Sequence, residues 1–381
     1  MVRLAIVLPA FQPNHLACFR SLASVPGIAP LFIELAPPAQ DPAWRDAQAG
    51  LEAKLLSLAG GPLPANLVRQ LVARLEAQDP DAIAIAGRDL APMRAAARWA
   101  QRKGKPAILI SDAIPPERSR WWRELPKKLH IRRHFAAAFV GGKTHAAYLA
   151  RLGMANDRIW DRCCVVDNGP FAAACSLPAD ERLQLRASLA LPEHYFLYAG
   201  PLSPDKNLQR LLEAYAVYCS RERVPWGLVL AGDGPQKNGL QDRAAKLRKG
   251  QVIVAEQPCE RLPAYYALAG AFVLPSLAEP WGLQVNEAMA AGLPVIASNR
   301  CGCAADLVQD GRNGLLFDPR EQEEMVASLG LMAALSDGQR QAMGRISQEI
   351  IAAYTPDAWA ASLAACLQHV LAYRPQPVPS G

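Results

Sequence analysis

Short apolar runs alternate with amphipathic stretches along the whole chain. Most runs are continuously apolar, as expected of strands that are covered on both faces, and the stretches between them have helical spacing. The predicted strands are 2–8, 29–34, 82–86, 107–111, 137–140, 163–166, 195–199, 227–231, 251–255, 271–275 and 294–298, and the predicted helices include 64–77, 90–102, 143–152, 207–221 and 236–248. This α/β alternation predicts doubly wound parallel sheets.

The chain is too long for one such sheet. Single hydrophobic cores stop growing near ~250–300 residues, and this chain has 381. The turn signal at 168–170 places the boundary of two Rossmann-like domains, which we expect to face each other across a cleft. We predict a first domain over 1–175, a second over 176–354, a C-terminal helix over 355–373 that crosses back to the first domain, and a loose tail over 374–381.

Composition indicates a soluble globular protein, since 51% of the residues are apolar and 20% are charged. A net charge of +6 suits anionic partners without choosing among them. No apolar run approaches the ~20 residues that cross a bilayer, so we expect a cytoplasmic protein. The nine cysteines include no Cys-x2-Cys pair with nearby histidines, which argues against a metal site.

The most informative segment is 273–298, where a predicted strand, a loop and a helix precede another strand. Glu279 lies in the loop, Gly282 begins the helix and Glu287 lies within it. Ligands bind beyond the carboxyl ends of parallel strands, and a helix start offers free amide groups to an anion. Glu287 could accept bonds from both ribose hydroxyls, while Glu279 could hold a sugar hydroxyl. Ordinary helix acids remain the alternative.

Two further turns follow predicted strands. Gly200 opens the first, in which Lys206 could carry a positive charge to a pyrophosphate, although a solvated lysine is an equal alternative. Gly232 lies in the second, within an Ala-Gly-Asp-Gly-Pro sequence that lacks the dinucleotide fingerprint spacing. We assign both glycines to substrate binding, together with Gly282 and its neighbours Trp281 and Leu283.

Together these motifs resemble family 4 of the retaining glycosyltransferases, which have the two-domain GT-B architecture. The resemblance is dense over 195–320 and rests on the Glu-x7-Glu spacing, the following Ala-Met-Ala-Ala-Gly-Leu-Pro-Val-Ile-Ala-Ser, and three shorter motifs at 231–235, 262–269 and 310–317. It is looser in the first domain.

The resemblance implies that Glu287 binds the donor ribose, Glu279 the donor sugar, and Lys206 the diphosphate. It implies transfer of a hexose-type sugar from a UDP- or GDP-linked donor to a hydroxyl of a glycan or lipid-linked acceptor, with retention and without a metal or other cofactor. The helix start and Lys206 would stabilise the charge that grows on the leaving phosphate. The nucleotide base would lie near Glu256 and Gln257.

Departures from the family pattern leave some roles open. Pro201 stands where the family commonly has an arginine, so one phosphate contact must come from elsewhere. Asp112 either takes the place of a family histidine at a strand end and touches the sugar, or has an N-cap or turn role. Asn14 and His15 replace a glycine-rich first turn and are candidates for the acceptor site, or simply polar residues near a helix start.

Two rival functions stay open. A GT-B phosphorylase or synthase that acts on a free sugar would share the fold, and fold alone does not settle chemistry. A non-catalytic protein that binds nucleotide sugar would also be consistent with Pro201 and with the missing histidine.

A basic segment lies at 118–133 in the first domain. It has seven Lys or Arg residues against one acid, with two adjacent tryptophans. Basic side chains and tryptophan favour an anionic membrane surface, and this family has many lipid-linked acceptors. A solvated basic helix is the alternative, and nucleic acid is less expected. The predicted docking residues are Arg120, Trp121, Trp122, Arg123, Lys127 and Lys128.

Overall fold

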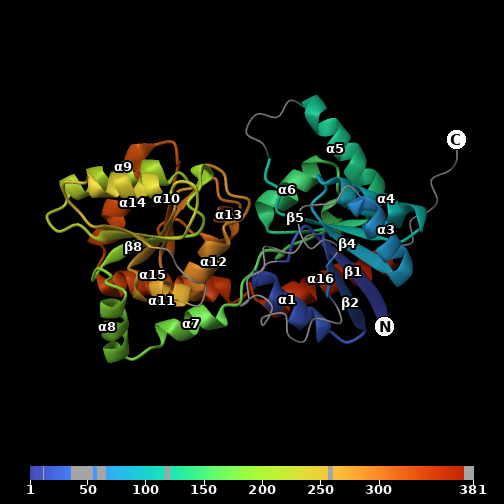
Figure 1. Ribbon diagram of the computed structural model, residues 1–381, viewed down its shortest axis with the longest axis horizontal. Coiled ribbons are helices and arrows are strands. Elements are labelled where there is room, and N and C mark those ends of the chain that lie inside the picture. Colours follow the sequence, from blue (N-terminus) through green and yellow to red (C-terminus); the bar gives the residue numbers. More distant parts are fainter. Residues whose placement is uncertain (12, 36–54, 58–65, 116–120, 256–260, 373–381) are drawn as a thin grey trace. The chain divides into compact units, whose positions relative to one another are not determined.

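The protein consists of two compact units, each built on one parallel sheet (Figure 1). The computed structural model describes all residues except 12, 36–54, 58–65, 116–120, 256–260 and 373–381. Met1–Val166 and Thr355–Gly381 form unit 1, and Asp167–Tyr354 form unit 2. The chain therefore enters unit 2 before the predicted boundary at 175/176, because α7 (Gly169–Cys175) packs on helices of unit 2.

Unit 1 contains a seven-stranded sheet in the order β3-β2-β1-β4-β5-β6-β7. All recorded strand pairs are parallel, so the carboxyl ends of the strands share one edge. The strands are β1 (Val2–Leu8), β2 (Ile28–Glu34), β3 (Leu55–Ser57), β4 (Ala82–Ala86), β5 (Ala107–Ser111), β6 (Ala137–Val140) and β7 (Ile159–Trp160).

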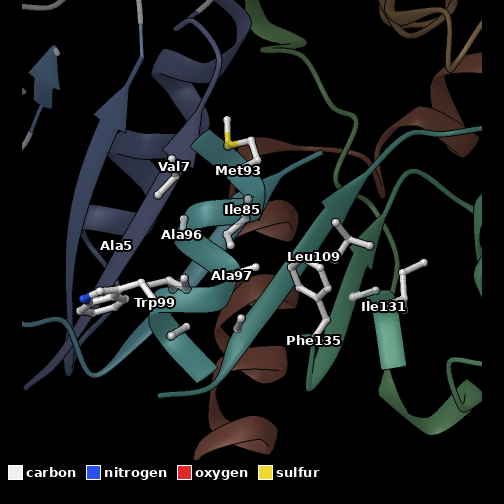
Figure 2. Packing of buried hydrophobic residues seen from close by; sticks show 14 of the residues in the cluster. Ala5, Val7, Ile85, Met93, Ala96, Ala97, Trp99, Leu109, Ile131 and Phe135 are labelled. Carbon is white, nitrogen blue, oxygen red and sulfur yellow. The ribbon is translucent and has the colours of Figure 1, made fainter. Parts of the chain in front are cut away.

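Helices cover both faces of this sheet, which explains its continuously apolar strands. On one face lie α3 (Leu67–Gln78), α4 (Ala91–Arg102), α5 (Trp121–His134) and α6 (Lys143–Arg151). α1 (Pro13–Ala23) and α16 (Pro356–Ala372) pack together on the other face. Figure 2 shows the core on the α4 side, where Met93 and Trp99 of α4 belong to one cluster with Ala5, Val7 and Ile85 of the sheet.

Unit 2 contains a six-stranded sheet in the order β10-β9-β8-β11-β12-β13. Its strands are β8 (Tyr195–Ala199), β9 (Gly227–Ala231), β10 (Val252–Ala255), β11 (Ala271–Leu274), β12 (Val295–Ser298) and β13 (Gly314–Phe317). The chain order of the strands reverses between β8 and β11, as it does between β1 and β4 in unit 1. Such a reversal opens a crevice at the carboxyl edge, where ligands of this fold class bind.

Helices also cover both faces of the second sheet (Figure 1). One face carries α9 (Leu208–Arg221), α10 (Lys237–Ala245) and α14 (Gln322–Ala334), and the other carries α8 (Ala179–Ser188), α11 (Leu262–Leu268), α12 (Leu283–Ala290) and α15 (Asp337–Ile351). The short elements η1 (Asn156–Arg158), η2 (Pro204–Lys206) and α13 (Ala304–Leu307) lie in connections. The prediction of doubly wound parallel sheets is confirmed.

The predicted strand over 163–166 is wrong, because the last strand of unit 1 is β7, at 159–160. Val165 and Val166 are buried at 2% and 4% exposure, so their apolar character reflects packing without strand pairing. The short strands β3 and β13 were not predicted. β13 follows the turn at 310–314, where Gly314 leaves no room for a side chain against the carbonyl oxygen of Val295.

One stretch, Asp337–Ala372, is long and apolar enough to cross a membrane by length and composition. It comprises two helices, α15 and α16, which are separated by non-helical residues and belong to different units. Each is shorter than the ~20 residues that span a bilayer, and each buries an apolar face inside its own unit.

Candidate functional site

The predicted donor residues meet at the carboxyl edge of the unit 2 sheet, where the strand order reverses. Gly200 directly follows β8, and Gly232 directly follows β9. The loop after β11 carries Glu279 and leads into α12. Segments that are distant in sequence are thus brought together by parallel strand pairing, as the sequence predicted.

The turns after β8 and β9 are joined backbone to backbone. Gly200 donates its amide to the carbonyl of Ala231 over 2.9 Å, and Leu202 donates to Asp233 over 2.8 Å. A side chain on Gly232 would come within 1.9 Å of the carbonyl oxygen of Gly200. Gly232 is therefore required for this close approach, and the amide of Gly200 is already bonded within the turn.

Lys206 and Glu279 form a buried ion pair. Lys206 lies in η2, and its Nζ donates to Oε2 of Glu279 over 2.5 Å, while both residues are less than a tenth exposed. Burial is the largest single influence on Lys206 and opposes its charge, but the hydrogen bonds and negative charges of Glu279 and Asp205 together outweigh burial and raise the pKa of the ammonium group. The lysine is thus a fixed cation, which excludes the solvated-lysine alternative.

The Glu279 carboxylate is held in place by several bonds. Ser276 donates to the same Oε2 over 3.1 Å, and the backbone of Glu279 pairs with Arg300 and Gly302. Among the described residues no donor bonds Oε1, so this oxygen is the one that could accept a ligand hydroxyl.

α12 begins beside this pair. Its N-cap, Gly282, has φ of 100°, which favours glycine, and a side chain there would meet Leu274 at 2.9 Å. Leu283 is the first helical residue, and the amide of Val285 is bonded to the carbonyl of Gly282. This leaves the amides of Leu283 and Gln284 without an acceptor among the described residues. An anion could bind these amides.

The indole of Trp281, a residue predicted to bind substrate, is buried in the core of unit 2. It is 2% exposed, and its Nε1 donates to Oδ1 of the fully buried Asn286 over 2.8 Å. An indole is large enough to fill the core beneath the loop, and burial requires a partner for its N–H group.

Glu287 lies on α12, partly buried. Tyr266 of α11 donates its hydroxyl to Oε2 of Glu287 over 2.7 Å. Burial raises the pKa of Glu287 to about 7, and the bond from Tyr266 opposes this shift. The carboxyl group therefore titrates near neutral pH, and hydrogen-bond donors from a ligand would stabilise its ionised form. An ordinary surface acid would have no such shift.

The unit 1 candidates lie near the corresponding edge of the first sheet. His15 stacks on Phe19 at 5.7 Å between ring centroids, and burial lowers the pKa of His15 to about 4, so the ring is neutral at pH 7. Asp112 follows β5 and is exposed. Asn14 lies in α1.

Several predicted residues lie outside the described structure. Gln257 and Glu256 fall within 256–260, and Arg120 falls within 116–120. Trp121 and Arg123 lie in α5, with side chains outside the described structure.

Sequence reasoning missed Tyr266, Ser276 and Asn286. Tyr266 belongs to the motif at 262–269, but spacing alone did not indicate that its hydroxyl reaches Glu287. Within the described ranges, no group of three or more His, Cys, Asp or Glu side chains is arranged to hold a metal ion.

Comparisons with known proteins place these residues in a family. Residues 181–349 match the family model described as "Glycosyl transferases group 1". Similar curated proteins include the O-antigen chain mannosyltransferase B of Escherichia coli, 33% identical over 47% of this chain, and a D-inositol 3-phosphate glycosyltransferase of Streptomyces bingchenggensis, 33% identical over 49% of it. Each match covers 45% of the relative, so the chain spans about half the length of the curated relatives it matches.

Fold similarity extends further than sequence similarity. HepE of Anabaena, solved in complex with UDP and glucose, matches 97% of this chain and 100% of its own with a TM-score of 0.75 at 16% identity. Sucrose-phosphate synthase of Thermosynechococcus elongatus matches 98% of this chain and 100% of its own with a TM-score of 0.73 at 20% identity. The resemblance to glycosyltransferase family 4 is confirmed, and residues 181–349 form a domain of the group 1 glycosyl transferases.

Proposed function

We propose that the protein is a retaining, metal-independent glycosyltransferase. It moves a hexose-type sugar from a UDP- or GDP-linked donor to a hydroxyl of a glycan or lipid-linked acceptor. The observation that carries this proposal is the buried Lys206–Glu279 pair beside the start of α12. It concentrates a fixed cation, free helix amides and a carboxylate where a sugar diphosphate of this family would lie.

The reaction follows from these groups. The acceptor oxygen forms a bond to the anomeric carbon as the bond from that carbon to the phosphate oxygen breaks. The leaving nucleoside diphosphate takes the proton of the acceptor hydroxyl. Lys206 and the amides at the start of α12 stabilise the charge that develops on the diphosphate, so that no metal is needed for this role. Glu287 accepts hydrogen bonds from the ribose hydroxyls.

Binding and turnover test the proposal separately. UDP and GDP are added to the protein in a thermal-shift panel, because a ligand that binds the native state raises its melting temperature. Release of nucleoside diphosphate from the matching nucleotide sugar, measured with and without EDTA, then reports turnover. Binding without turnover would support the non-catalytic alternative, and EDTA sensitivity would contradict metal independence.

We also propose that α5 docks the protein on an anionic membrane surface, at the inner face of the cell membrane. Trp122, Leu125 and Leu129 are 49%, 46% and 60% exposed, and their spacing places them on one side of the helix. Ile131 is fully buried and packs the helix on the core of unit 1. Three large apolar side chains are thus left in solvent on one helix.

Charge on α5 favours anionic lipid over another apolar partner. Lys127 and Lys128 are partly exposed, and Arg132 and Arg133 are exposed. The one acid of the helix, Glu124, is paired with Arg151 over 2.7 Å. Basic residues at a membrane surface contribute roughly 1 kcal/mol apiece, and apolar side chains insert beside them.

Flotation with liposomes tests this docking. The protein should float with vesicles rich in anionic lipid at low salt, and high salt should release it. Changing Lys127, Lys128, Arg132 and Arg133 to glutamine should abolish flotation, whereas Leu331→Ser, which removes an exposed leucine from α14, should not. Flotation that is unchanged by the glutamine substitutions would contradict the proposal.

A further inference from the structure

The chain passes from unit 1 to unit 2 at 166/167 and returns at 354/355. Inside unit 2 the two crossing segments are tied together by Asn168. Its Nδ2 lies 3.2 Å from the carbonyl oxygen of Ile351 and 3.3 Å from that of Tyr354. The start and the end of unit 2 are therefore held as one piece.

A first series of contacts connects Glu279 to the crossing segments that Asn168 joins. Trp281 lies two residues after Glu279, and its ring packs against that of Tyr354 with centroids 6.2 Å apart. The indole N–H is fixed by Asn286 of α12, and the carbonyl of Trp281 accepts the amide of Cys303 over 3.1 Å. The donor loop therefore rests on the last residue of unit 2.

A second series of contacts leads from Glu287. Tyr266, which bonds the carboxylate of Glu287, meets the ring of Phe171 edge to face at 5.3 Å. Phe171 lies in α7, immediately after the other crossing. Cys175, at the end of α7, donates to the carbonyl oxygen of Ala291 at the end of α12 over 2.9 Å. Each of the two donor carboxylates is thus linked through one aromatic residue to a crossing segment.

We infer that Trp281 and Tyr354 are positioning residues that hold the Glu279 loop for sugar transfer, and that donor binding is transmitted through them to the crossing segments. The inference rests on the proposed function of Glu279 and Glu287. Packed rings within a rigid core transmit small displacements, because such cores are close-packed. The rings of Tyr354 and Trp281 make this contact.

Two substitutions at Tyr354 separate this role from simple stability. Tyr354→Leu removes the ring while leaving the Trp281–Asn286 bond, and Tyr354→Phe keeps the ring. We expect turnover of nucleotide sugar by Tyr354→Leu to fall about tenfold, since small misplacements of a loop reduce rates strongly. Affinity for the nucleoside diphosphate alone, which has no sugar to contact Glu279, should change less than about twofold. Tyr354→Phe should retain turnover.

Hydrogen exchange measures the transmission directly. Saturating the full-length protein with the nucleotide sugar that it binds, without acceptor, should slow exchange in 350–355, the segment whose Tyr354 contacts Trp281. This protection should be lost in Tyr354→Leu and retained in Tyr354→Phe. Trp226→Phe is the matched control, because Trp226 is a buried indole of the same unit that stacks on His194 instead. It should keep both turnover and protection.

Calorimetry on the unchanged protein distinguishes the possible failures. If no nucleoside diphosphate binds, the proposed donor site is wrong and this inference falls with it. If the nucleotide sugar binds but exchange in 350–355 is unchanged, the inference alone is overturned. It is also overturned if Tyr354→Leu lowers the melting temperature while its folded fraction keeps full turnover.

Discussion

The two sheets share the order of their first six strands, but the side chains at their carboxyl edges differ in chemistry. In unit 2, the acids Glu279 and Glu287 are held by Lys206 and Tyr266. In unit 1, His15 is neutral within an aromatic stack and Asp112 is exposed. The family model matches only residues 181–349, whereas fold similarity spans 97% of the chain. A common fold therefore carries buried, paired charges at one edge, and a neutral histidine with an exposed acid at the other.

Lys206→Gln gives the largest effect that this contrast predicts. The glutamine keeps a hydrogen-bond donor for Glu279 but removes the charge that stabilises the leaving diphosphate. Turnover should fall by about 10²–10³, as when one electrostatic donor is removed from an active site. The free nucleoside should bind nearly as before. Lys103→Gln in unit 1, which breaks an exposed pair with Glu76, is the control and should keep full turnover.

Gly232→Ala should disrupt the joined turns of unit 2. The added methyl group would lie 1.9 Å from the carbonyl oxygen of Gly200, so the backbone must move. We expect the free energy of unfolding to fall by about 3 kcal/mol or more and nucleotide binding to be lost. Gly239→Ala, in α10, meets nothing within 4 Å and should be neutral or slightly stabilising. Denaturant titrations compare the two; equal stabilities would contradict the described turn.

Glu287→Gln should separate stability from binding. The folded-state pKa of Glu287 is raised from 4.5 to about 7, so the native state favours the protonated form. Its contribution to stability is present below pH 4.5 and is lost as the pH rises through 7. The loss is at most about 3 kcal/mol, at 1.36 kcal/mol for each pKa unit. The glutamine variant should lack this decline and be the more stable protein at pH 8.

Glu287→Gln should also weaken binding of the nucleotide. Charge-assisted hydrogen bonds contribute about 1.5–3 kcal/mol, so affinity should fall at least tenfold at pH 8. In the unchanged protein, affinity should rise as the pH increases through 7 and the carboxylate ionises. Calorimetry at several pH values checks both trends. A pH-independent affinity equal to that of the variant would remove Glu287 from the site.

Asp112→Asn should have the smallest effect. Asp112 is exposed in unit 1, and substitutions of such residues change stability by less than about 0.5 kcal/mol. Affinity for the nucleotide, which we assign to unit 2, should not change. Reduced turnover with unchanged nucleotide affinity would show that Asp112 contacts the sugar or the acceptor. A reduced affinity for the nucleotide would contradict its assignment to unit 2 alone.

The sequence predicted much of unit 2 because its signals are local. The strand ends at Ala199 and Leu274, and the helix start at Gly282, follow from apolar runs and glycine turns. Trp281 shows the limit of this reasoning. Its place beside Gly282 suggested a ligand contact, whereas its indole is buried and bonds Asn286, because spacing cannot indicate where a side chain points.

The sequence by itself determined the two doubly wound sheets, since apolar periodicity and turn residues act over a few neighbouring positions. It also predicted which acids and which lysine form a donor site, through motifs that resemble those of a known family. Only the tertiary structure decided the state of those groups. Lys206 is a fixed cation because Glu279, 73 residues away, bonds it in the core. Glu287 titrates near neutral pH because the fold buries it against Tyr266. Charge and pKa depend on burial and on distant partners, which only packing of the whole unit supplies.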